Sequence, residues 1–319
     1  MTSKSGPRQI GVAVATGVLL FSIAIALAWG WAFIHRASRP VREFAQLRGL
    51  SVTGSETPQV FLATRTGLIR SDSQGVWYWV GTNRDDINGF ALSAAEPGTI
   101  YVSGRPARGS RRPNPLGLRV SRDWGQTWAD LSLAGEVNFL VLAVSPANPR
   151  YIYGWDGTLF YVSDDAGRRW QTRSPATWNL DAGRLNSLAA HPEDPLHLVA
   201  AFDRGVARSL DGGASWSFLN QEGPATAVAI DPRDSMHLLA YLMPAGGGRL
   251  YESRDGGATW TMVGAPAAAD DPVTHLALWA VDPSVVYAGT AGASLYRSND
   301  GGRTWNQLVR AGRPLAVAP

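Results

Sequence analysis

A serine hydroxyl and an aspartate carboxylate lie two residues apart in five copies of one phrase, Ser-x-Asp-x-Gly-x-x-Trp. The copies begin at residues 121, 163, 209, 253 and 298. Such a pair could contribute to a catalytic site, or it could satisfy the backbone of a tight turn. Because the same residues return each time, the pattern favours repeated turn chemistry over five separate sites. We therefore predict a structural role for Ser121, Asp123, Gly125, Trp128, Ser163, Asp165, Gly167, Trp170, Ser209, Asp211, Gly213, Trp216, Ser253, Asp255, Gly257, Trp260, Ser298, Asp300, Gly302 and Trp305.

Each residue type of the phrase suits a hairpin turn. In the copy SRDGGATW, the carboxylate of Asp255 can accept hydrogen bonds from turn amides. Gly256 and Gly257 can adopt backbone angles that other residues avoid. Trp260 can bury a large ring between neighbouring hairpins. The phrase is therefore expected to stabilise the fold rather than to form a site.

The segments between the copies also repeat, at intervals of 42, 46, 44 and 45 residues. The last copy follows THLALWAVDP, SVVYAG and ASLYRS, which are short apolar runs bounded by turn residues and indicate strands. Four strands in about 45 residues are typical of a β-propeller blade. A degenerate sixth unit at 59–80 keeps Ser71 and Gly75 but has Ser73 and Tyr78 in place of the Asp and Trp. The sequence predicts an all-β, six-bladed propeller of four-stranded antiparallel blades over 58–319.

The first unit has no recognisable leading strand. The C-terminal segment RPLAVAP (313–319) matches the leading segments LAVSP (142–146) and WAVDP (279–283). A C-terminal strand placed in blade one would complete the ring and leave no open sheet edge. We therefore expect the C-terminus to close the propeller.

The repeated phrase resembles the Asp-box, or BNR repeat, of sialidases, the sortilin propeller, xyloglucanases and photosystem II assembly factors of the YCF48/HCF136-like type. In those families the phrase lies on the face away from the ligand site, which the resemblance implies here too. Segments 103–128 and 135–155 also look like bacterial single-propeller proteins that carry the label glycosyl hydrolase or exo-sialidase. A shared label of this kind describes the fold and establishes no reaction.

The expected ligand face carries the loops that join one blade to the next and the loops between second and third strands. It is rich in polar residues, which suit a polar ligand, a glycan or a protein loop, although surface loops are polar in general. The segment 105–115 is the largest insertion, and its arginines favour an anionic partner. The predicted binding residues are Arg84, Glu136, Asn138, Asp156, Asp181, Arg184, Arg204, His275, Arg105, Arg108, Arg111 and Arg112.

Two functions remain open. The first is a protein- or glycan-binding or assembly scaffold, and the alternative is a sialidase-like glycoside hydrolase. The sialidase Arg-Ile-Pro stretch is absent, LIRSDS (68–73) being the nearest, and xyloglucanases use two propellers where this chain has one. A glycosidase needs two carboxylates about 5–10 Å apart. No catalytic residue is predicted beyond the weak candidates Asp85, Asp86, Asp270 and Asp271; a carboxylate pair across the channel mouth would identify an enzyme.

Residues 10–34 contain no charged side chain and are long enough to span a bilayer. We predict a transmembrane anchor there, between a short tail (1–9) and a juxtamembrane linker (35–57). Flanking charges slightly favour a cytoplasmic C-terminus, but the resembling families are mostly secreted, lumenal or periplasmic. We therefore expect the propeller on the extracytoplasmic side of the cytoplasmic membrane, with an unknown protein or glycan partner.

Composition excludes several classes of chemistry. The chain has no cysteine, so disulfides, zinc–thiolate sites and thiol nucleophiles are impossible. The formal net charge is +3 and the arginines are mostly scattered, which disfavours nucleic acid as a partner. His191 and His237 lack ligand-spaced neighbours, so no metal or other cofactor is expected.

Overall fold

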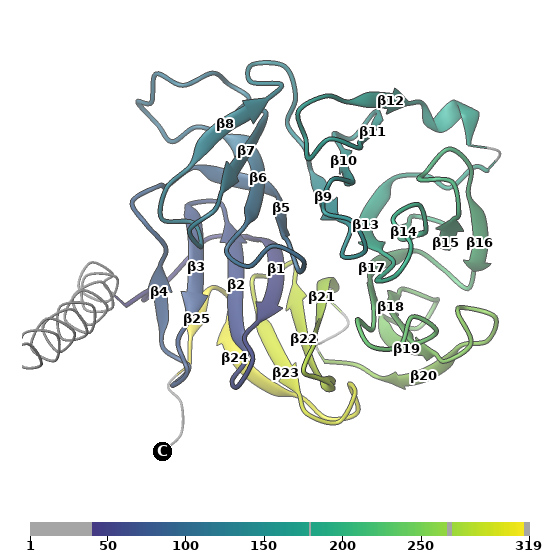
Figure 1. The fold of residues 1–319 in the computed structure, drawn as a ribbon. Helices are drawn as coiled ribbons and strands as arrows, with labels where there is room; N and C mark the ends of the chain where they lie inside the picture. The colour runs from purple at the N-terminus through teal and green to yellow at the C-terminus, as the bar shows by residue number, and fades with distance from the viewer. Residues whose placement is uncertain (1–39, 179, 267–269, 316–319) are drawn as a thin grey trace, which may run out of the picture. The chain divides into compact units, whose positions relative to one another are not determined.

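The computed structural model describes residues 40–315 except 179 and 267–269. Within this part the chain forms six antiparallel sheets that follow one another around a ring (Figure 1). The first strand of each blade packs beside the first strand of the next, and β21 of blade six packs beside β1 of blade one. This closed circle of neighbours confirms the predicted six-bladed β-propeller of four-stranded blades, with a short fifth strand added at the outer edge of blade six.

Blades one to three each run from an inner strand to an outer strand. Blade one contains β1 (Leu47–Thr53), β2 (Gln59–Thr64), β3 (Gly67–Ser71) and β4 (Trp77–Trp79). Blade two contains β5 (Asp86–Leu92), β6 (Ile100–Arg105), β7 (Leu118–Ser121) and β8 (Ala129–Ser132). Blade three contains β9 (Val141–Val144), β10 (Ile152–Trp155), β11 (Phe160–Ser163) and β12 (Gln171–Arg173).

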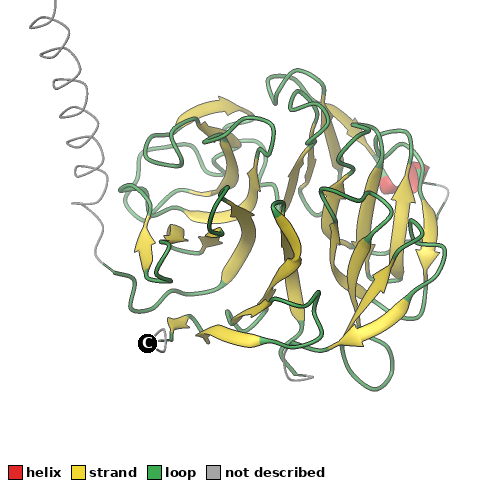
Figure 2. Cartoon of the chain, turned by 60° about the horizontal axis from the view of Figure 1, so that its bottom comes forward, coloured by secondary structure: helices red, strands yellow, loops and turns green. Residues whose placement is uncertain are grey.

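A short 3-10 turn, η1 (Pro175–Thr177), follows blade three and is drawn red in Figure 2. Blade four contains β13 (Leu185–Ala190), β14 (Leu198–Phe202), β15 (Gly205–Ser209) and β16 (Ser217–Asn220). Blade five contains β17 (Ala225–Ile230), β18 (Leu238–Leu242), β19 (Arg249–Ser253) and β20 (Thr261–Gly264). Blade six contains β21 (Val273–Trp279), β22 (Asp282–Thr290), β23 (Leu295–Ser298), β24 (Asn306–Arg310) and β25 (Arg313–Pro314).

The core is divided into six apolar clusters, each between two neighbouring blades. Second strands such as β2 are buried along almost their whole length, because both faces of an inner strand pack against other blades. Phe61 packs with Ile100 between blades one and two, and Trp178 packs with Phe202 between blades three and four. Burial of one such side chain contributes about 1.5–3 kcal/mol. Each blade therefore depends on two neighbours for its stability.

The strand that completes blade one differs from the prediction. The segment expected to be a juxtamembrane linker (35–57) contains β1, which is the inner strand of blade one and pairs with β2 from Leu47↔Thr64 to Thr53↔Gln59. The expected C-terminal closing strand is wrong. Its described part, β25, pairs with β24 at the outer edge of blade six. Because β1 already occupies the inner edge of β2, blade one has no place for a C-terminal strand.

Side chains and a short N-terminal segment close the ring instead of a shared strand. One apolar cluster joins blade six to blade one and includes Tyr287 and Leu62. Trp279 Nε1 donates to the carbonyl of Gly54 at 2.7 Å. The Phe44 amide donates to the carbonyl of Gly312 at 2.9 Å, so the segment before β1 also contacts blade six.

The repeated phrase forms the hairpin between the third and fourth strands, as predicted. In blade five, Ser253 Oγ donates to Asp255 Oδ1 at 2.8 Å and accepts from the Gly257 amide at 2.8 Å. Asp255 accepts from the Thr259 amide at 2.9 Å and from its hydroxyl at 2.6 Å. Gly257 has a φ of 95°, and Trp260 Nε1 donates to its carbonyl at 3.1 Å. The serine–glycine bond recurs in all five copies.

The degenerate copy in blade one has a different turn from the one expected. Asp72, rather than the residue aligned with the aspartate, accepts from the amides of Gln74 and Val76, both at 2.9 Å. Trp77 is buried and Tyr78 is half-buried, so the tryptophan one position earlier supplies the packed ring. The carboxylate and the ring have both moved by one residue, which hides them from an alignment of the copies.

The predicted membrane segment 10–34 and the tail 1–9 lie outside the described residues. Within residues 40–315, apart from the gaps, no helix has the length and apolar character needed to span a membrane.

Candidate functional site

The face opposite the repeated hairpins opens into the central channel. Its mouth is a recess of about 360 Å³ at the starts of the first strands, and a narrower cavity of about 120 Å³ lies deeper. Propeller blades converge there, so residues from every blade line one small space. The side chains of the mouth with hydrogen-bonding groups are Gln46, Arg48, Asn88, Arg184, Asn186, Thr226, Thr274 and His275.

Two guanidinium groups make the mouth electropositive. Arg48 at the start of β1 donates to Gln46 Oε1 at 2.7 Å, and its Nε has no hydrogen-bond partner among the described residues. Arg184, just before β13, donates to Asn186 Oδ1 at 3.0 Å. No carboxylate is among the described residues that line the mouth or the channel. The mouth therefore suits a ligand that accepts hydrogen bonds.

His275 is neutral near pH 7. Its side chain is half-buried and lines the narrow channel, where burial lowers its pKa to about 4. Its Nδ1 lies 2.9 Å from the hydroxyl of Thr274. Across the ring, Asn88 Nδ2 donates to Asn138 Oδ1 at 3.1 Å. The mouth thus offers amides, a hydroxyl and a neutral imidazole beside its two cations.

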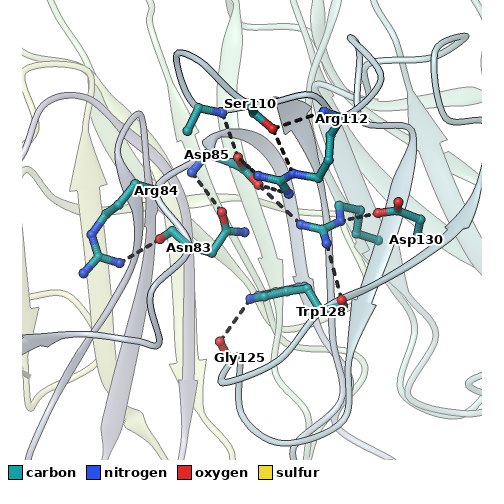
Figure 3. A network of polar contacts seen from close by, with 10 residues as sticks. Asn83, Arg84, Asp85, Ser110, Arg112, Gly125, Trp128 and Asp130 are labelled. Atoms are coloured by element: carbon teal, nitrogen blue, oxygen red, sulfur yellow. Dashed lines mark hydrogen bonds and ion pairs between the residues drawn. The ribbon is translucent and has the colours of Figure 1, made fainter. Parts of the chain in front are cut away.

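Asp85 has a structural role in a polar network (Figure 3). It is 1% exposed and accepts from Arg112, at 2.7 Å for the Nη1–Oδ2 contact, and from Arg119 Nη1 at 3.3 Å. The Ala107 amide donates to its Oδ1 at 2.8 Å. Arg119 also donates to Asp130 Oδ1 at 2.6 Å. A carboxylate with these partners anchors the 105–115 loop to the interior.

The other predicted catalytic candidates do not form a free pair of facing carboxylates. Asp86 at the start of β5 lies 4.0 Å from Arg65. Asp271 accepts from the Gly292 amide and the Thr290 hydroxyl, both at 2.7 Å, so it stabilises the turn after β22. Asp270 is exposed. Neither adjacent aspartate pair lines the mouth, and their catalytic role remains an untested prediction.

The predicted binding residues divide between the mouth and its rim. Arg184 and His275 line the mouth. Asn138 accepts a hydrogen bond from Asn88, which lines the mouth. Asp156 accepts from the hydroxyl of Tyr161 at 3.0 Å and from loop amides. Asp181 pairs with Arg204 at 2.8 Å at the rim. Arg105 is the last residue of β6, and the other predicted residues lie on the loops of this face: Arg84, Glu136, Arg108, Arg111 and Arg112.

Several mouth residues lie outside the set predicted from the sequence. Gln46 and Arg48 belong to the segment expected to be a linker, and Asn186 and Thr226 lie inside apolar leading strands. The detectable signal was a polar residue at the second position of those strands, where the side chain points into the channel. Asp203 positions two residues of the mouth. Its carboxylate accepts a hydrogen bond from Asn186 Nδ2 at 2.9 Å and one from the Arg184 amide at 3.2 Å.

Metal ligation finds no support in the described part of the chain, where no group of three or more histidine, cysteine or acidic residues could hold an ion. The His191 and His197 rings stack at 4.3 Å on the opposite face. They contribute to a turn and not to the mouth.

Comparison with known proteins identifies the class of fold. No protein-family profile matches the chain. The chain is 31% identical over 156 residues to a xyloglucanase of Hypocrea jecorina (strain QM6a), a match that covers 48% of this chain and 18% of that protein. The chain thus matches less than a fifth of this curated relative.

Solved propellers are similar over most of the chain. The GH74 xyloglucanase from Xanthomonas campestris has a TM-score of 0.59 at 19% identity and covers 85% of this chain, which spans 46% of that protein. YCF48 from Cyanidioschyzon merolae has a TM-score of 0.53 at 18% identity, with 84% of this chain and 86% of that chain covered. YCF48 has also been solved bound to a D1 peptide, with a TM-score of 0.52 at 17% identity, covering 85% of this chain and 83% of that chain. These likenesses define the chain as a β-propeller with xyloglucanase-type and YCF48-type neighbours.

Proposed function

We propose that the propeller binds a glycan at the mouth of its central channel, as a protein related to glycoside-hydrolase propellers. The observation that carries this proposal is the convergence of Arg48, Arg184, Asn88 and Asn186 on one recess that contains no carboxylate. Guanidinium and amide groups donate to sugar hydroxyl and carboxylate oxygens, and a concave site with a few polar groups is the usual form of a ligand site.

The comparisons support a glycoside-hydrolase relationship more than a membrane-anchored assembly scaffold. The curated relative is a xyloglucanase, and the structural neighbours include a GH74 xyloglucanase and an ancestral GH74 enzyme. The structural neighbours share the fold, and the curated relative matches about half of this chain. The identity of the glycan is therefore part of what we propose.

Glycan binding can be tested by isothermal titration of the full-length protein with soluble polysaccharides and their oligosaccharides. Arg184→Gln together with Asn186→Ala should weaken binding about tenfold or more, because two donors to the ligand are lost. Arg122→Gln is the matched control, since Arg122 is exposed on the opposite face and its ion pair with Glu96 is long, at 3.8 Å. Equal affinities for the two variants would refute the proposed site.

Hydrolysis is the second candidate, favoured by the xyloglucanase match. It requires two carboxylates about 5–10 Å apart. The carboxylate that supports the mouth directly is Asp203, through its contact with Asn186. If the chain hydrolyses xyloglucan at this site, Asp203→Asn should reduce the release of reducing ends, because Asp203 positions Asn186 and the backbone of Arg184. Absence of product with the unmodified protein would reject hydrolysis and leave binding intact.

The membrane location is a separate proposal. We infer from the apolar segment 10–34 that the protein is anchored in a membrane. We infer an extracytoplasmic propeller because the families that the repeated phrase resembles are mostly secreted, lumenal or periplasmic. A reporter enzyme fused after Pro319 tests this placement. Activity of the reporter only in the cytoplasm would contradict it.

A further inference from the structure

Blades one and two carry a concentration of exposed positive charge on the ligand face. We call it the cationic sector; it consists of Arg65, Arg84, Arg105, Arg108 and Arg111, all of them exposed. Arg65 lies in the turn between β2 and β3, and Arg84 lies before β5. Arg105 is the last residue of β6, and Arg108 and Arg111 lie on the loop that follows it.

The three segments of the cationic sector are neighbours in space. Asp86 pairs with Arg105 across β5 and β6, and its carboxylate lies 4.0 Å from Arg65. The backbone of Gly67, beside Arg65, approaches Arg84 so closely that a side chain at Gly67 would contact it. The acidic groups beside this sector are Asp86 and, on the adjoining loop, Glu136, whose neighbour Gly135 donates to Pro115 at 2.8 Å. The cations therefore outnumber the exposed anions around them.

The loop is held in place rather than left free. Arg112 is fixed by Asp85, and its amide and Nε donate to Ser110 Oγ at 3.2 and 3.3 Å. The amide of Leu116 donates to Gly104 at 2.9 Å. Figure 3 shows the contacts of Arg112 with Asp85 and Ser110 that join the loop to the interior. A loop ordered before binding loses less conformational entropy when it meets a ligand.

Three guanidinium groups on this ordered loop have no protein partner. Among the described residues, no hydrogen bond or ion pair involves the side chains of Arg105, Arg108 and Arg111. Arg112, in contrast, is engaged by Asp85. Arg112 therefore fixes this segment, whereas Arg105, Arg108 and Arg111 are exposed to solvent.

We propose that the cationic sector binds an acidic polysaccharide, one whose sugars carry carboxylate groups, and holds it across the ligand face toward Arg48 and Arg184 at the channel mouth. This inference rests on the proposed glycan binding and names its substrate class. Guanidinium pairs with carboxylate through two parallel hydrogen bonds, which favours carboxylated sugars over neutral ones. An extended polymer can meet the cationic sector and the mouth at the same time.

The surface chemistry disfavours other polyanions. Docking to an anionic bilayer is usually reinforced by inserted apolar side chains, but the exposed large apolar residues of the described chain lie outside the 105–115 loop. Single-stranded nucleic acid requires aromatic rings on which bases stack, and Trp79, the aromatic beside the sector, is covered by Arg84 at 4.7 Å.

The test compares polygalacturonate with neutral xyloglucan as ligands of the full-length protein, at low and moderate salt. The triple variant Arg105→Gln, Arg108→Gln, Arg111→Gln should lose about ten- to a hundredfold in affinity for polygalacturonate and show a weaker salt dependence. The matched control is Arg122→Gln, Arg150→Gln, Arg168→Gln, which removes the same charge from exposed positions on the opposite face. The control should change affinity less than about twofold.

The outcomes separate the inference from the proposed function. Equal losses in the triple variant and its control would overturn the inference, because they would show an effect of net charge alone. Binding of xyloglucan without any binding of polygalacturonate would also overturn it while supporting the proposed glycan function. Absence of binding to both would defeat the proposed function itself. A third arm uses phosphatidylcholine vesicles containing phosphatidylserine. Loss of vesicle binding in the triple variant, with polygalacturonate binding unchanged, would assign the sector to a membrane surface.

Discussion

Replacing Asp85 with asparagine should destabilise the propeller by about 3 kcal/mol and release the 105–115 loop. The substitution keeps the size of the side chain and removes the charge that two arginines share. Removing one partner of a buried ion pair costs about 3–5 kcal/mol, because the remaining charge stays buried without compensation. For Asp85→Asn we expect the lower end of this range of energies, for two reasons. Arg119 retains Asp130 at 2.6 Å, and the side chain of Arg112 is 29% exposed, so water can solvate part of it.

The assay combines thermal unfolding with limited trypsin digestion. For a domain of this size, 1 kcal/mol shifts Tm by about 2–4 °C, so the Asp85→Asn protein should melt about 6–12 °C below the unmodified protein. Trypsin should cut faster after Arg108 and Arg111, which are not followed by proline, since the Arg112 contact no longer fixes the loop.

Asp86→Asn is the matched control for this substitution. It removes the same charge from the next residue, whose ion-pair partner Arg65 is exposed and 4.0 Å away. It should change stability by less than about 1 kcal/mol. Equal melting temperatures and equal digestion rates for the two variants would refute the assignment of Asp85 as the anchor of the loop.

Three further predictions concern the turns and the channel. Gly257→Ala should lower the free energy of unfolding by about 1–3 kcal/mol in urea denaturation, because a Cβ there would lie 2.6 Å from Leu219 Cδ1 at a φ of 95°; an unchanged midpoint would contradict the packing. Hydrogen bonds from the hydroxyl and amide of Thr259 lower the pKa of Asp255 to about 2, so its contribution to stability is present above about pH 4 and is lost as the pH falls toward 2. Unfolding curves over that range should lose part of their pH dependence in Asp255→Asn. Burial lowers the pKa of His275 to about 4, so stability should fall as the pH drops from about 6.5 to 4, and this decrease should be smaller in His275→Asn; identical pH profiles would show that His275 remains hydrated.

The fold could be predicted to a large extent because its signals are local and repeated. A hairpin with a serine, a carboxylate, a positive-φ glycine and a tryptophan requires the same residues wherever it occurs. The observed turn of blade five contains the expected bond from a turn amide to Asp255 and the expected positive φ at Gly257. Copies at a constant interval then imply stacked units of equal size, and hence the number of blades.

Ring closure could not be predicted because two segments have similar local patterns. LRGLSVT (47–53) and RPLAVAP (313–319) both suit an inner strand. Only one of the two segments can pair with the inner edge of β2. The strand β1 pairs there, and a short connection along the chain joins it to β2. A strand that is close in sequence loses less entropy on pairing than one at the far terminus.

The sequence by itself determined the repeated turn, the blade and the polar character of the ligand face. The tertiary structure alone decided which of those polar groups are available. Asp85 and Asp86 are identical neighbours in sequence, yet Asp85 is fully buried against Arg112 and Asp86 is half-buried at the start of β5. Arg48 and Asn186 are 138 positions apart and meet at one mouth. The physical reason is that turn chemistry depends on a few adjacent residues, whereas burial and charge pairing depend on contacts between distant blades.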